Sequence, residues 1–104
     1  MAQNTVTVGI LVTLSAKPGK ESELADFLTG ALPLAQDEPA TTAWFVTKID
    51  DSTYGIVDFF PDDAGRQTHL DGPIAAALMD RADDLLASAP DIKPIDALAS
   101  KLPG

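Results

Sequence analysis

Two side chains in the second half of the sequence can transfer a proton or bind an oxyanion. His69 is the only histidine, and histidine is the side chain whose ordinary pKa lies nearest neutral pH. It is therefore the natural general base. Arg66 precedes it by three residues, a spacing that places both on one helix face, where the guanidinium can bind a phenolate or a carboxylate. The structural alternatives are that His69 packs or caps a short helix and that Arg66 is solvated.

Asp58 is a carboxylate among apolar neighbours in the middle of an expected strand, an unusual position for a lone acid. There it can orient His69 or accept a hydrogen bond from a substrate hydroxyl. It can equally pair with Arg66, or lie in water at the edge of a sheet.

Most aromatic side chains fall in two neighbouring expected strands. Tyr54 and Phe60 share a strand face with Asp58, and Trp44 lies in the preceding strand. Flat ligands stack well on such rings. We therefore expect Trp44, Tyr54 and Phe60 to line a pocket for a small aromatic molecule, or else to fill the core or a dimer interface, as strand aromatics commonly do.

Composition excludes several kinds of chemistry. Without cysteine the chain has no disulfide, thiolate metal site or cysteine nucleophile. A single histidine rules out a metal site with two imidazoles, and the acidic pairs lack the alternating spacing of a calcium loop. The sequence contains neither a glycine-rich phosphate loop nor Gly-x-Ser-x-Gly. We expect no metal site.

Sixteen acidic residues against seven basic ones give a net charge of -9. Such a surface repels phosphate backbones and anionic lipids, so we expect neither nucleic acid nor a membrane as a partner. No apolar run approaches the roughly 20 residues of a membrane span. The segment Met1–Thr5 has no basic region leading into an apolar core, so we expect no secretory leader and a cytoplasmic protein.

The 104 residues suit one domain, over residues 1–104. Alternating apolar residues predict strands, and apolar residues every three or four positions predict helices. Pro33 is expected to kink the first helix or to end it near Leu32, and Pro90 to stop the last one. The expected elements are a strand over 6–14, a helix of four to five turns carrying Leu24 to Ala35, a hairpin of strands over 41–49 and 53–60, a short helical stretch ending at 71–72, a helix from 73, and a weaker strand over 92–102.

This β-α-β-β-α-β order is that of the ferredoxin-like fold, an α+β domain whose antiparallel sheet carries its helices on one face. The other face is expected to be partly apolar, because Leu11, Leu98 and one face of the Trp44–Phe45 strand contribute to it. A homodimer packed sheet to sheet would cover these residues.

Three stretches of the sequence resemble the antibiotic biosynthesis monooxygenase domain, a family of dimeric α+β barrels. They are Lys17-Pro18-Gly19-Lys20-Glu21 after the first strand, Glu38-Pro39-Ala40-Thr41-Thr42-Ala43-Trp44, similar to the family's Glu-Pro-Gly-Thr-x-x-Tyr/Trp, and Asp58-Phe59-Phe60-Pro61-Asp62-Asp63-Ala64 with the Ala-x4-His that ends at His69. The resemblance covers about residues 6–100. Ala40 stands where the family usually has Gly, and Asp58 where Glu is commoner, which shortens the reach of that carboxylate.

The resemblance implies a monooxygenase that oxidises a small aromatic, quinol-like molecule with O2, without flavin, metal or other cofactor. In this interpretation His69 is the base, Asp58 its polar partner, and Trp44, Tyr54, Phe60 and Arg66 bind the substrate. Two alternatives stay open on the same fold. One is a non-catalytic or stress-associated dimer that binds a small ligand, and the other is an oxygen-independent isomerase.

Overall fold

Four strands form one antiparallel sheet in the order β2-β3-β1-β4. The alternation of apolar residues along the strands fixes how they pair. The computed structural model describes residues 5–103, so most of the Met1–Thr5 segment, on which the expectation about a leader rests, lies outside the described residues. The elements are β1 (Val8–Ser15), α1 (Glu21–Thr29), α2 (Leu32–Gln36), β2 (Ala43–Asp50), β3 (Thr53–Phe60), α3 (Asp63–Leu70), α4 (Pro73–Leu85) and β4 (Asp91–Asp96). The ferredoxin-like α+β fold predicted from the sequence is confirmed.

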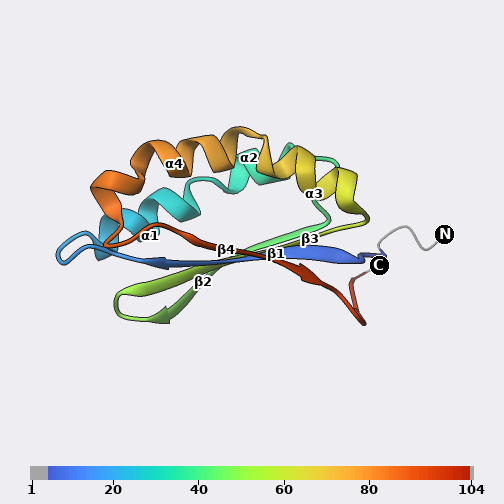
Figure 1. Ribbon diagram of the computed structural model, residues 1–104, viewed down its shortest axis with the longest axis horizontal. Coiled ribbons are helices and arrows are strands. Elements are labelled where there is room, and N and C mark those ends of the chain that lie inside the picture. Colours follow the sequence, from blue (N-terminus) through green and yellow to red (C-terminus); the bar gives the residue numbers. More distant parts are fainter. Residues whose placement is uncertain (1–4, 104) are drawn as a thin grey trace.

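The helices of the described chain form a layer over one face of the sheet, and the opposite face carries no helix (Figure 1). The even-numbered residues of β1 and β3 face the helices, because successive strand side chains point to opposite faces. They meet the buried stripes of α1 and α4. The core is built from Val8, Ile10, Val12, Leu14, Leu24, Leu28, Tyr54, Ile56, Phe60, Leu78, Leu85 and Leu86.

The first helical segment is shorter than expected. A single helix of four to five turns is wrong: α1 ends at Thr29, and the five-residue α2 begins at Leu32. Pro33 lies in the first turn of α2, where the missing N–H is not needed by the helix. The proline therefore starts a new helix instead of ending the old one.

The last strand is also shorter than the expected 92–102. β4 ends at Asp96, opposite Val8, because β1 offers no further partner beyond the bond from Ala97 N to Thr7 O. Pro94 is compatible with β4 because this strand lies at the edge of the sheet. Leu98, expected on the open sheet face, lies past the strand with its side chain 95% exposed.

Two neighbours in α4 provide a test of where the core lies. Leu78 is 6% exposed and packs in the core, whereas Met79 is 57% exposed. We expect Leu78→Ala to lower the free energy of unfolding by about 2–5 kcal/mol, because it leaves a cavity. Met79→Ala should change it by less than about 0.5 kcal/mol. Urea unfolding of both variants measures this, and equal losses would contradict the packing described.

Candidate functional site

His69 is positioned by the way α3 begins. Asp62 caps the helix, its side chain accepting a hydrogen bond from Gly65 N at 2.9 Å. The cap fixes the helical phase and puts His69 in the last turn, facing the sheet, where the helix dipole favours a cation. The imidazole is 7% exposed and lies 5.3 Å from the Phe60 ring, centroid to centroid.

Asp58 lies beneath His69 in the sheet. It occupies the middle of β3, opposite Ile10 of β1 and Trp44 of β2, and is 1% exposed. Its Oδ2 is 3.0 Å from His69 Nε2. Of the roles expected for Asp58, the structure therefore places it against His69, away from the sheet edge and not on Arg66.

Glu38, to which the sequence assigned no role, completes the site. It follows α2 and precedes β2, and its Oε1 lies 2.6 Å from His69 Nδ1. Thr41 Oγ1 donates to the same oxygen at 2.7 Å. The Glu-Pro motif was the available signal, but spacing along the chain could not reveal this contact, because Glu38 and His69 are 31 residues apart.

Two carboxylates determine the charge of His69. A neutral imidazole has one donor and one acceptor nitrogen, so one carboxylate would face a lone pair, whereas the imidazolium donates to both. Burial by itself lowers the pKa of His69, but the hydrogen bonds and charges of Asp58 and Glu38 outweigh it, so the pKa is raised above its ordinary 6.5. The structure thus favours a buried cation between two anions.

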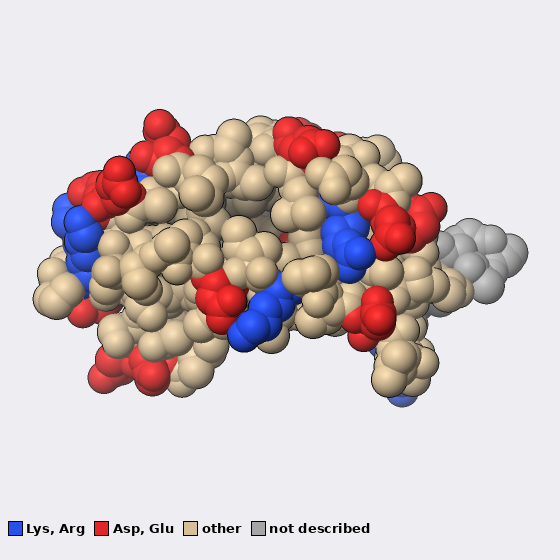
Figure 2. Space-filling view, in the orientation of Figure 1, with Lys and Arg blue, Asp and Glu red and all other residues tan. Residues whose placement is uncertain are grey.

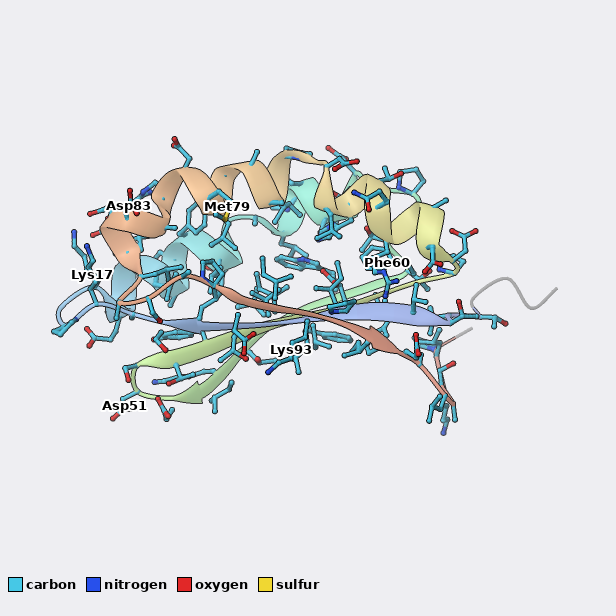
Figure 3. All side chains as sticks on the ribbon, in the orientation of Figure 1. Lys17, Asp51, Phe60, Met79, Asp83 and Lys93 are labelled. Carbon is cyan, nitrogen blue, oxygen red and sulfur yellow. The ribbon has the colours of Figure 1, made fainter. Side chains whose placement is uncertain are left out.

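Not all the aromatic residues expected to line a pocket lie near His69. Phe60 touches His69 from within the core, between the sheet and α3 (Figure 3). Trp44 lies beside Asp58 on the neighbouring strand. Tyr54 shares their sheet face, but four residues from Asp58 along β3 is about 13 Å. It lines a separate cavity of about 360 Å³ near Ser22, Ala25, Thr29, Val46, Thr47 and Lys48.

Arg66 holds strands together. Its Nη1 donates to the carbonyl oxygens of Gly9 in β1 at 3.2 Å and Ile95 in β4 at 3.3 Å, and Nη2 pairs with Asp63 at 2.9 Å. The guanidinium therefore already donates to three acceptors. The structure does not bring it to the His69 imidazole.

On the face drawn in Figure 2 acidic side chains outnumber basic ones, and this face is hollowed between α4 and β4. Among residues 5–103 no cluster of three or more His, Cys, Asp or Glu side chains is arranged to hold a metal ion. Each ring nitrogen of His69 already faces a carboxylate. None of the helices in the same residues has the length and apolar character to cross a membrane.

Solved structures similar to this chain share its fold. The NE2512 protein of Nitrosomonas europaea, of unknown function, is 53% identical over 97% of this chain and 98% of its own, with a TM-score of 0.95. A candidate antibiotic biosynthesis monooxygenase from Caulobacter crescentus is 20% identical over 90% of this chain and 92% of its own, with a TM-score of 0.77. Another, from Nitrosomonas europaea, is 13% identical over 88% and 90%, with a TM-score of 0.79.

No protein-family model and no curated protein matches the sequence. At 20% and 13% identity the two candidate monooxygenases establish the fold alone. The resemblance read from the three sequence motifs is confirmed at that level. The chain belongs to the same family as the NE2512 protein, and its fold is that of the antibiotic biosynthesis monooxygenases.

Proposed function

We propose that the protein is a cofactor-independent monooxygenase that oxidises a small, hydroxylated aromatic molecule with O2. The observation that carries this proposal is the Glu38–His69–Asp58 group, in which His69 and Asp58 are buried and Asp58 Oδ1 has no hydrogen-bond partner among the described residues. A buried acceptor beside a fixed cation is an arrangement that removes a proton and stabilises the anion formed. The fold shared with the candidate monooxygenases supports the same assignment.

The three residues take different roles in this proposal. His69 has no free nitrogen, so Asp58 replaces it as the base and accepts the substrate's hydroxyl proton at Oδ1. The His69 imidazolium stays charged and stabilises the phenolate and the superoxide that follows. Glu38 touches no substrate and is a positioning residue that keeps His69 protonated and oriented.

The reaction needs no outside reductant. A ring methylene beside a hydroxylated ring loses two hydrogens and gains one oxygen atom as a carbonyl. The second oxygen atom leaves with the two hydrogens as water, so the four electrons that O2 takes up all come from the substrate. The protein supplies the acceptor, the positive charge and a site closed to bulk water.

In this proposal the protein acts as a homodimer, and the two copies pack through the open sheet face. The positions of β1 and β3 that point away from the helices carry no charge, although the chain has sixteen acids. They are Gly9, Leu11, Thr13, Ser15, Thr53, Gly55, Val57 and Phe59. Leu11 and Phe45 are exposed on this face. A second copy presenting the same uncharged stripe would cover it.

Oxygen uptake tests the activity. With anthrones, quinols and dihydroxynaphthalenes as substrates and chelator in the buffer, we expect uptake above the spontaneous rate, with carbonyl product by chromatography. Asp58→Asn should lower the rate about 100-fold or more, since it removes the base. Asp26→Asn, at an exposed acid on α1, is the control and should leave it unchanged. Turnover under nitrogen would favour an isomerase, and binding without turnover a ligand-binding protein.

The titration of His69 tests its charge. Its ring signals are those of the only histidine, so NMR follows them without ambiguity. We expect a midpoint above 6.5, because the carboxylates outweigh burial in raising the pKa. Glu38→Gln should lower that midpoint, whereas Asp37→Asn, at the exposed neighbouring acid, should not.

The same pKa shift contributes to folding stability with a definite sign. Because the folded protein holds its proton more tightly, the contribution is complete below pH 6.5 and is lost as pH rises through the raised pKa. A wild-type midpoint at or below 6.5 would remove the imidazolium from the proposal.

The oligomeric state tests the sheet interface. Leu11→Asp places a charge in the centre of the open face and is expected to convert a dimer into a folded monomer. Met79→Asp adds the same charge to an exposed apolar position in the helix layer and should leave the dimer intact. Light scattering after size exclusion and circular dichroism measure mass and folding. A monomeric wild type, or an unaffected Leu11→Asp dimer, would contradict the interface.

A further inference from the structure

Two unpartnered polar atoms belong to residues that lie side by side in the sheet. Among the described residues, the buried Trp44 Nε1 and Asp58 Oδ1 have no hydrogen-bond partner. Their residues stand directly opposite in the β2–β3 pairing, with both side chains on the helix-facing side. One atom is a donor and the other an acceptor, yet they do not bond to each other. Leaving both buried and unmet costs free energy, which a third group between them would recover.

The chemistry of this pair selects the third group. It has to accept from an indole N–H and donate to a carboxylate oxygen, and a hydroxyl does both with one oxygen atom. An ether accepts but cannot donate. A carboxylate also cannot donate, and it would bring a third negative charge to a site that already holds Asp58 and Glu38.

Trp44 also borders the space in which the rest of such a ligand can lie. β2 is an edge strand, and Trp44 lines two cavities beside it. One, of about 250 Å³, is lined with Thr29, Leu32, Phe45 and Val46; the other, of about 350 Å³, with Thr42, Ala43, Phe45, Leu102 and Pro103. These walls are mostly apolar, and either volume holds one or two fused rings. Asp58 lines neither cavity, so a ligand reaching its carboxylate from here has to move the indole of Trp44 aside.

We propose that Trp44 Nε1 and Asp58 Oδ1 form a subsite for a single hydroxyl group on a neutral, flat, apolar ligand. The ligand's oxygen accepts from the indole and donates to the carboxylate, while its rings lie in the cavities beside β2. The subsite adds to the proposed function. It rests on that function only for the claim that this ligand is a substrate. It excludes ethers and anions of the same shape.

Binding of three matched probes to the wild-type protein tests the subsite without any substitution. The probes are 2-naphthol, 2-methoxynaphthalene and 2-naphthoate, and the readout is the single indole N–H signal in a ¹H–¹⁵N spectrum, since the chain has one tryptophan. We expect 2-naphthol to shift this signal and to bind at least tenfold more tightly than the ether or the acid. Equal binding of naphthol and ether, or no binding of any probe, would overturn the subsite.

Two variants separate the N–H from the ring. Trp44→Phe keeps an aromatic ring but removes the donor, so the preference for naphthol over the ether should fall about tenfold. Thr68→Val removes a hydroxyl group from an exposed position of α3, away from the subsite, and should leave the preference unchanged. An unchanged preference in Trp44→Phe would overturn the proposal, as would its loss in Thr68→Val.

The outcomes for binding and for turnover are independent. Selective naphthol binding without oxygen uptake from any tested substrate supports the subsite and counts against the monooxygenase. Oxygen uptake with no preference for the hydroxyl supports the monooxygenase and overturns the subsite.

Discussion

The imidazole ring of His69 joins parts of the chain that are far apart in the sequence. Glu38 reaches it from the connection between α2 and β2, and Asp58 from the centre of the sheet. Each contact depends on the others, because a buried carboxylate that loses its cation is left uncompensated. The position of α3 over the sheet is therefore coupled to the contacts of one imidazole.

Outside this group the chain follows ordinary rules of folding. Strand residues alternate between core and surface, Asp62 caps α3, and prolines occupy the first turns of α2 and α4. The buried polar atoms without partners are instead gathered around His69: Glu38 Oε2, Trp44 Nε1 and Asp58 Oδ1, within the described residues. Departures from local consistency that concentrate in one place are typical of a functional site.

Much of the fold could be predicted from the sequence, because strands and helices are specified by residues that are close together in the chain. Period-two alternation placed β1 and β3, and it correctly put Asp58 and Phe60 on one face. Asp58 and His69 stood out by residue type. Glu38 could not be assigned in this way, since its contact with His69 depends on the break between α1 and α2, which sets where the following loop lies. The length of β4 could not be predicted either, because β4 ends where β1 offers no further residue to pair with.

The packing of α3 against the loop after α2 leaves room for one methyl group only. A side chain added at Gly65 would place its first carbon 3.3 Å from the Ala40 methyl and 3.4 Å from the Ala40 carbonyl oxygen. The first of these contacts is tight, so Ala40 or α3 would have to move by a few tenths of an ångström. Positions 40 and 65 therefore share a limited volume, and we expect them to covary among homologues, with a larger side chain at one position accompanied by a small one at the other.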